Sequence, residues 1–219
     1  MTIRVLIADD EAMVRAGLRL ILERHSDLEV VGEAVDGAEA VEAARRCQPD
    51  IVLMDVRMPR LDGIEATRRL IANAGGSIRV LVLATFDLDE YVFKALRVGA
   101  SGFMLKESSP EELVAAVRLV AAGNALLAPA RTRQLINQYV LRAPEETVPL
   151  LSTLTSRERE VLKLLARGLS NAQIAATLGV GETTVRTHVA HVLSKLEVST
   201  RVQAVVLAYE AGLAQPVNT

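Results

Sequence analysis

Two different hydrophobic patterns divide the chain. In the first 123 residues, short runs of Val, Ile and Leu alternate with stretches in which apolar residues recur every three or four positions. Nearly continuous apolar runs predict strands buried on both faces, and the wider spacing predicts amphipathic helices. The expected strands are 3–8, 28–34, 51–54, 79–84 and 102–105, and the expected helices are 12–24, 37–47, 64–73, 88–97 and 110–122. Five such repeats favour an α/β domain with a five-stranded parallel, doubly wound sheet.

After about residue 123 the strand pattern ends and only helical patterns follow. Three prolines punctuate a connecting segment, 124–150, within which residues 130–141 are expected to form a helix. Four more helices are expected at 156–167, 171–178, 182–196 and 200–212. Residues that commonly cap helices, such as Ser170 and Gly179, mark their ends. The predicted organisation is an α/β domain over 1–123, a linker over 124–150 and an all-α four-helix domain over 151–216.

Composition narrows the class of protein. Half of the residues are hydrophobic, only 3% are aromatic and Trp is absent, which is typical of an aliphatic core. Cys47 is the single cysteine, so a disulfide framework and a cysteine-based metal site are excluded. The apolar run at the N-terminus is too short for a signal peptide, and no stretch approaches the roughly 20 apolar residues of a membrane span. We expect a cytoplasmic protein with no membrane contact.

The distribution of charge says little about nucleic acid. The net charge is −2, but residues 150–219 carry seven Lys and Arg against five Asp and Glu, whereas the remainder carries 18 against 22. The C-terminal region is therefore mildly basic and the rest mildly acidic. An ordinary difference between two surfaces explains this asymmetry about as well as a role in DNA binding.

Five polar residues are expected at one edge of the predicted sheet. Asp9 and Asp10 follow the first strand, Asp55 follows the third, and Thr85 and Lys106 end the fourth and fifth. Ligands of such sheets bind beyond the carboxyl ends of the strands. Carboxylates gathered there repel one another unless a cation joins them, and oxygen ligands suit Mg²⁺. A carboxylate beside Mg²⁺ can attack a phosphoryl group, with the lysine and the hydroxyl stabilising the charge on its oxygens.

Taken singly, each of these residues has an ordinary explanation. An acidic pair after a strand commonly caps a helix, a lone Asp commonly forms a turn, and a Lys or Thr at a strand end is commonly a surface residue. Their joint placement at one sheet edge is what favours the phosphoryl chemistry.

Four motifs carry a resemblance to a known family. The segments ADDE at 8–11, DVRMPRLDG at 55–63, AT at 84–85 and GFMLK at 102–106 resemble the receiver domain of two-component response regulators, in that order and spacing. The resemblance covers roughly residues 3–120 and implies a flavodoxin-like fold with Asp55 as the phosphoacceptor. The implied Mg²⁺ ligands are the side chains of Asp10 and Asp55, the backbone carbonyl of Arg57, and Asp9 through water. Thr85 and Lys106 would contact the phosphoryl group, and Phe103, at the switch-aromatic position, would move together with Thr85.

The same resemblance implies a sensor histidine kinase as the phosphoryl donor. The chain has no nucleotide-binding loop, so direct use of ATP is not expected, and the protein is not classed as an enzyme. A metal-dependent phosphatase of the haloacid dehalogenase type is the rival from another class, but such enzymes place a second Asp two residues after the nucleophile, where this chain has Arg57. A regulator that ignores phosphate and responds to a ligand or a partner protein is a nearer alternative.

The stretch 170–196 has the pattern of a helix-turn-helix. Ser170 or Asn171 caps a short helix, Gly179 permits a left-handed turn, and a longer helix follows. That helix is expected to bury Val185, Val189, Val192, Leu193 and Leu196. Its opposite face carries small residues and one arginine, a composition that suits the major groove of DNA: Thr183, Arg186, Thr187, Ala190 and Ser194. From periodicity alone, a four-helix bundle of unknown purpose is equally compatible.

Residues 154–196 closely resemble the LuxR-type helix-turn-helix of the NarL/FixJ family, and the likeness continues to about residue 213. This implies binding of double-stranded promoter DNA, with helix 182–196 as the recognition helix and the last helix supporting a homodimer when active; RNA polymerase is a further candidate partner. The implied DNA-binding residues are Thr183, Thr184, Arg186, Thr187, Ala190 and Lys195, although an ordinary solvated charge also explains Lys195. Gly181 stands where the family usually has Ser or Thr, and Ala190 where some relatives carry a basic residue that touches DNA.

The presence of both sets of motifs predicts a switch. In the closed form that the resemblance suggests, the receiver masks the recognition helix. Phosphorylation of Asp55 would favour inward positions of Thr85 and Phe103 and release the second domain to dimerise on DNA.

Overall fold

The structure is a computed structural model, and it describes residues 2–74, 78–85, 89–123 and 151–213. The chain divides into two compact units, Met1–Leu126 and Leu127–Thr219, and each is described by itself. The predicted linker, 124–150, and its predicted helix, 130–141, lie outside the described residues. Within the described part, no helix combines the length and the apolar character needed to cross a membrane.

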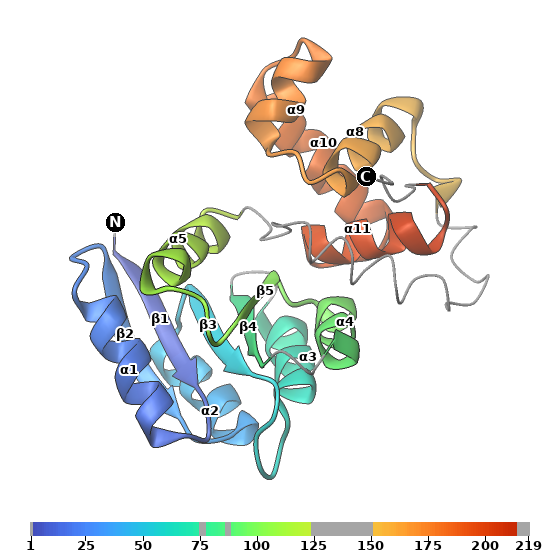
Figure 1. Cartoon of the computed structure of the whole chain (residues 1–219). Coiled ribbons are helices and arrows are strands. Elements are labelled where there is room, and N and C mark those ends of the chain that lie inside the picture. The colour runs from blue at the N-terminus through green and yellow to red at the C-terminus, as the bar shows by residue number, and fades with distance from the viewer. Residues whose placement is uncertain (1, 75–77, 86–88, 124–150, 214–219) are drawn as a thin grey trace. The chain divides into compact units, whose positions relative to one another are not determined.

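The first unit is a parallel α/β sheet (Figure 1). Its strands are β1 (Ile3–Ala8), β2 (Leu28–Ala34), β3 (Ile51–Asp55), β4 (Arg79–Ala84) and β5 (Gly102–Leu105). Its helices are α1 (Ala12–Glu23), α2 (Gly37–Cys47), α3 (Gly63–Ala74), α4 (Asp89–Val98) and α5 (Pro110–Ala121). All strand pairs are parallel and their order is β2-β1-β3-β4-β5, while α1 and α5 cover one face and α2, α3 and α4 the other. The predicted fold class is confirmed.

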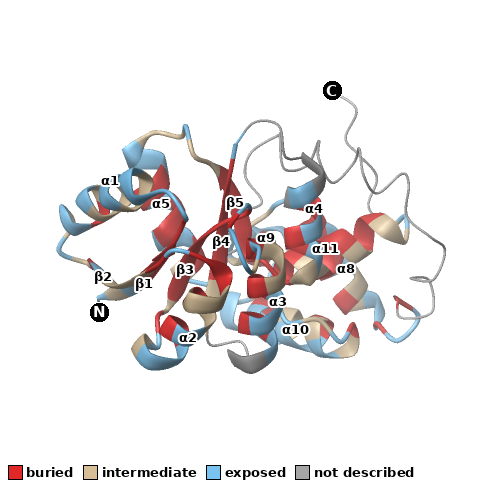
Figure 2. Ribbon diagram, turned by 90° about the horizontal axis from the view of Figure 1, so that it is seen from below, coloured by how far each residue is buried: buried red, intermediate tan, exposed pale blue. Residues whose placement is uncertain are grey.

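Burial explains the near-continuous apolar strands. Every residue of the central strand β3 is buried, as are all but the first of β4, whereas the edge strand β2 is buried only at its two ends (Figure 2). A strand between two layers of helices has no face left for water, so polar alternation disappears. Because the strands run parallel, the carboxyl ends of β1, β3, β4 and β5 share one edge of the sheet.

Helix caps in this unit follow local chemistry. At α5 the Ser109 hydroxyl accepts the Glu112 N–H (3.2 Å), and the Glu112 carboxylate accepts the Ser109 N–H (2.9 Å), with Pro110 in the first turn. This reciprocal pair confirms the predicted start of the helix. Asp36 begins α2 in a way that the sequence analysis did not identify: its buried carboxylate accepts the N–H groups of Ala38 (2.8 Å) and Glu39 (2.9 Å).

The second unit consists, among its described residues, of four helices. They are α8 (Ser156–Ala166), α9 (Asn171–Leu178), α10 (Glu182–Lys195) and α11 (Arg201–Glu210). Helix α8 packs against α10 and α11, and α9 packs against α10. Capping boxes begin α8, α9 and α11, and Gly179 ends α9 with a φ of 65°, as the turn between two helices requires.

One buried arginine joins three segments of this unit. Arg201, at the start of α11, donates to the Asn171 Oδ1 (3.0 Å) and to the backbone carbonyl of Leu169. Burial lowers the pKa of its guanidinium to about 10, so the group stays charged at neutral pH. These contacts hold the first helix of the helix-turn-helix against α11.

Candidate functional site

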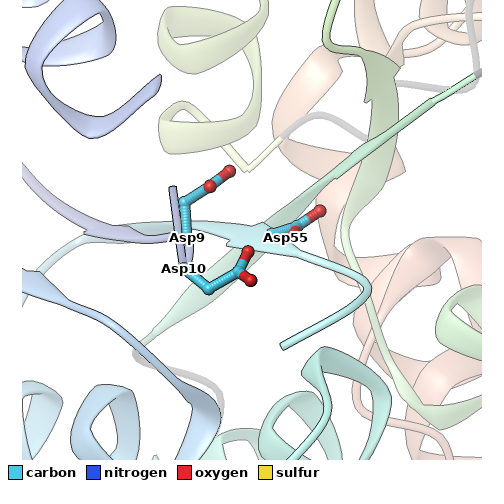
Figure 3. Close-up of side chains that lie close together, drawn as sticks. All are labelled: Asp9, Asp10 and Asp55. Carbon is cyan, nitrogen blue, oxygen red and sulfur yellow. The ribbon is translucent and has the colours of Figure 1, made fainter. Parts of the chain in front are cut away.

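Three carboxylates meet at the carboxyl edge of the sheet, as the sequence predicts (Figure 3). Asp9 and Asp10 follow β1 and Asp55 is the last residue of β3, and each offers an oxygen within 4.8 Å of the others. Their environments differ, because Asp9 and Asp55 are buried whereas Asp10 is exposed. The set therefore combines two carboxylates fixed in the protein with one at the mouth of the site.

Lys106 lies between the two buried carboxylates. It follows β5 directly, and its Nζ is 2.7 Å from the Asp9 Oδ2 and 3.1 Å from the Asp55 Oδ1. The backbone fixes its position, since the Lys106 N–H donates to the carbonyl of Ala84 at 2.9 Å. The lysine therefore neutralises part of the charge of the acidic cluster without a metal ion.

Burial decides the protonation of Asp55. It raises the pKa of this carboxyl to about 6; the charge of Lys106 opposes the rise and the charge of Asp9 adds to it. For Lys106, burial acts to lower the pKa, but its hydrogen bond to Asp9 and the charges of Asp55 and Asp9 prevail, so its pKa lies above the ordinary value. At neutral pH the cluster thus contains an ionised Asp55 beside a firmly protonated lysine.

Backbone groups fix the orientation of the acids. The Asp55 Oδ1 accepts the N–H of Val56 (2.8 Å), and the Asp9 Oδ1 accepts the N–H of Glu11 (2.9 Å). In addition, Arg15 of α1 donates to the backbone carbonyl of Asp9 at 2.8 Å. The Asp9 Oδ2 is left to pair with Lys106, whereas Lys106 and the Val56 N–H share the Asp55 Oδ1.

The loop after β3 is held close to Asp55. A Cβ atom at Gly63, the first residue of α3, would lie 1.9 Å from the Asp55 carbonyl oxygen, so only glycine fits there. The far side of the loop is tied to α2, because the Gly37 N–H donates to the Leu61 carbonyl (3.0 Å) and Arg60 pairs with Asp36. The backbone that carries Arg57 is thereby placed next to the acids.

The other predicted receiver residues differ in their exposure. Thr85 follows β4 and is exposed, whereas Phe103 on β5 is buried. Arg57 is exposed, and its guanidinium carbon lies 5.3 Å from the centre of the Tyr91 ring on α4. In the described conformation Thr85 is therefore open to solvent while the aromatic side chain of Phe103 lies inside the unit.

The donor set fits a hard divalent cation. All the candidate side-chain ligands are carboxylate oxygens, and the exposed Asp10 leaves one side open to water, which suits Mg²⁺ because this ion keeps several waters. A dication would also reduce the repulsion between Asp9 and Asp55.

Helix α10 has the two faces that its sequence predicts. Val185, Val192 and Leu196 are buried, and Val189 and Leu193 are partly buried. The opposite face is exposed and comprises Thr183, Thr184, Arg186, Thr187, Ala190 and Ser194. Gly181 is the N-cap and supplies no side-chain hydrogen bond, in line with the departure noted in the sequence.

Two carboxylates beside this face were not identified from the sequence. Glu182 Oε1 lies 2.7 Å from an Arg186 guanidinium nitrogen. The buried Glu158 of α8 pairs with Lys195 (2.6 Å), whose hydrogen bond lowers the pKa of Glu158 to about 2. Lys195, predicted as a DNA contact, is therefore engaged within the domain. The i,i+4 spacing could have revealed the first pair, but no local signal reveals the second.

Comparisons with known proteins match each of the two units to a family. The family described as "Response regulator receiver domain" matches residues 5–118, and "Bacterial regulatory proteins, luxR family" matches residues 152–208. The chain is 42% identical over 215 residues to the "Uncharacterized transcriptional regulatory protein YxjL" of Bacillus subtilis, covering 97% of this chain and 98% of that protein. It is 40% identical over 215 residues to the "Response regulator protein VraR" of Staphylococcus aureus, covering 98% and 100%.

A solved structure shows the same combination of domains. The response regulator ChrA of a heme-sensing two-component system matches with a TM-score of 0.54 and 39% identity, covering 97% of this chain and 98% of that one. The likeness to these proteins thus extends along nearly the whole of both chains. The chain belongs to the response regulator family and is a transcriptional regulator that joins a receiver domain to a LuxR-type DNA-binding domain.

Proposed function

We propose that this regulator binds Mg²⁺ through Asp10, Asp55 and the Arg57 carbonyl, with Asp9 acting through water, and accepts a phosphoryl group on Asp55 from a sensor histidine kinase. The observation that carries the proposal is the convergence of three carboxylates within 4.8 Å, with Lys106 between the two buried ones. Mg²⁺, when bound, supplies positive charge to the phosphoryl oxygens.

In this proposal, each residue around Asp55 has a separate role in phosphoryl transfer. The ionised Asp55 attacks phosphorus, and the bond from phosphorus to the donor nitrogen breaks with its electron pair leaving on the imidazole. Lys106 is close enough to Asp55 to stabilise the charge on the transferred oxygens, and Thr85 donates to them once it turns inward. Phe103, already buried in the described conformation, is proposed to change position together with Thr85. Because burial raises the pKa of Asp55 to about 6 before a metal binds, protons compete with Mg²⁺ for this carboxylate, and the reaction should slow in acid.

A direct test is to incubate the full chain with Mg²⁺ and acetyl phosphate and to measure its intact mass. We expect one phosphoryl adduct on the wild type and none on Asp55→Asn. Asp50→Asn is a matched control, because Asp50 directly precedes β3, at the end opposite Asp55, and its carboxylate accepts the Arg4 N–H (2.8 Å). Absence of the adduct from the wild type, or its persistence in Asp55→Asn, would refute the assignment. Steady turnover of a phosphomonoester would instead indicate the phosphatase.

We further propose that Thr183, Thr184, Arg186, Thr187 and Ala190 form the surface of α10 that reads promoter DNA. Their exposure on one face supports this assignment. Lys195 can contact a phosphate only when its ammonium group separates from Glu158. Arg186→Ala is expected to weaken specific binding by about 1–3 kcal/mol if the arginine contacts a base. Fluorescence anisotropy with a selected duplex measures the change, with Arg167→Ala as an exposed control; equal affinities for both variants would contradict the assignment.

The regulatory proposal is that phosphorylation of Asp55 relieves masking of α10 and promotes dimeric binding, α11 supporting the dimer. Its support is the occurrence of a phosphoacceptor site and a DNA-reading helix in one chain. A gel-shift titration of phosphorylated wild type against Asp55→Asn tests it: we expect markedly tighter and dimeric binding of the phosphorylated form. Equal binding would show that phosphorylation does not control DNA affinity.

The remaining expectations belong to the same proposal. The domain limits 1–123, 124–150 and 151–216, location in the cytoplasm and contact with RNA polymerase follow from the regulatory function. The proposed limits of the two domains enclose the spans that the two families match, 5–118 and 152–208.

A further inference from the structure

The charges of the recognition helix are paired within the domain. Helix α10 carries two permanent cations, Arg186 and Lys195. Arg186 lies 2.7 Å from Glu182 of the same helix, and Lys195 lies 2.6 Å from Glu158 of α8. A helix that binds DNA mainly through phosphates would keep its cations available, since phosphate neutralisation dominates sequence-independent affinity. This helix instead neutralises both.

The pair of Glu182 and Arg186 lies on the exposed face proposed to enter the groove. The side chains are 44% and 69% exposed, so both can reach a bound duplex. A surface pair at this spacing contributes little to the stability of a helix, particularly in salt. Replacing Glu182 should therefore change the affinity for DNA more than it changes the free energy of unfolding.

We propose that Glu182 is a specificity-determining residue, which holds the Arg186 guanidinium toward base edges and away from phosphates. The inference rests on the proposed role of α10 in reading DNA. A guanidinium has five N–H donors, so a bond to Glu182 leaves enough of them for the O6 and N7 acceptors of guanine. The carboxylate is repelled by phosphate and cannot itself bind the backbone of the duplex.

The pair therefore has two different consequences for DNA. Against random sequence, Glu182 competes with phosphates for Arg186 and weakens binding. Against a site with guanine at the right position, the arginine is already oriented, and less side-chain freedom is lost on binding. The ratio of specific to non-specific affinity rises through both effects.

The test uses the full chain, treated with Mg²⁺ and acetyl phosphate, and duplexes selected from a random library. For Glu182→Gln we expect affinity for a scrambled duplex to rise on the order of threefold to tenfold, and the salt dependence to steepen by about one unit, as one more cation reaches phosphate. Reselection should show a weaker preference for guanine at the position that Arg186 reads. The control is Glu160→Gln, since the exposed Glu160 also pairs with an arginine of its own helix, Arg157, three positions earlier on α8 (2.7 Å).

The outcomes separate this inference from the proposed function. If Arg186→Ala lowers the specificity ratio and Glu182→Gln does not, or if Glu160→Gln has the same effect as Glu182→Gln, the role of Glu182 is refuted and the reading face stands. If Arg186→Ala also leaves the ratio unchanged, the reading face itself is wrong and the inference falls with it.

Discussion

Lys106→Met is expected to lower the free energy of unfolding of the receiver unit by about 2 kcal/mol at neutral pH, in the absence of divalent ions. The lysine lies 2.7 Å from Asp9 and 3.1 Å from Asp55, and its loss leaves two buried carboxylates facing each other. The effect is smaller than the roughly 3–5 kcal/mol of a fully buried pair, because Lys106 is partly open to solvent. Asp55→Asn should act in the opposite direction and raise the free energy by about 1 kcal/mol.

The two substitutions change the free energy of unfolding in opposite directions because of the raised pKa of Asp55. Burial raises this pKa from 3.8 in the unfolded chain to about 6, so the folded state keeps a proton that the unfolded state has lost. Wild-type stability consequently falls as the pH rises through this range, and the full penalty is present above about pH 6. The gain from Asp55→Asn should vanish near pH 4. The loss of stability in Lys106→Met should also become smaller in acid, because protonation of Asp55 removes its repulsion with Asp9.

Chemical unfolding followed by circular dichroism measures both effects. In EDTA, the two variants should lie on opposite sides of the wild type at neutral pH. Adding Mg²⁺ at ten times its dissociation constant should stabilise the wild type by about 1.4 kcal/mol and Asp55→Asn by much less. A stabilised Lys106→Met at neutral pH would show that the lysine does not balance these acids.

A second large effect is expected at the start of α3. Gly63→Ala places a Cβ 1.9 Å from the Asp55 carbonyl oxygen and 2.9 Å from its carbon, so the helix or the strand must move. Both atoms are backbone, and no side chain can rotate away. We expect destabilisation of about 3 kcal/mol or more, and a lower rate of phosphorylation because the loop carrying Arg57 shifts.

Gly17→Ala is the matched control. Gly17 is in the interior of α1, and nothing lies within 4 Å of the position that its Cβ would occupy. Alanine there should stabilise the protein by about 0.5–1 kcal/mol, because it favours the helix. The same chemical change is thus expected to have opposite signs at the two positions. If Gly63→Ala were as stable and as readily phosphorylated as the wild type, the loop would not need this close contact.

The sequence predicted much of the fold because the relevant forces are local. Nearly continuous apolar runs and apolar residues at helical spacing located each described strand and helix to within two residues. Ser109, Thr155 and Ser170 cap helices through neighbours three positions away. Asp36 uses the same chemistry, but no cap was assigned between the predicted strand 28–34 and the predicted helix 37–47.

The parallel sheet also made the location of the acids predictable. Once β1 and β3 are neighbours, Asp9, Asp10 and Asp55 must meet at one edge, whatever their side-chain positions. The sequence by itself therefore determined the elements, the sheet type, the place of the phosphoacceptor site and the exposed face of α10.

Only the tertiary structure decided how the charges are balanced. Whether Asp9 or Asp10 is buried, how far the pKa of Asp55 rises, and which acids Lys106 joins depend on atoms that separate strands bring within a few ångströms. The pairing of Lys195 with Glu158 likewise spans 37 positions of the chain. Electrostatic interactions fall with distance in space and with exposure to water, and neither quantity can be read from the order of the residues.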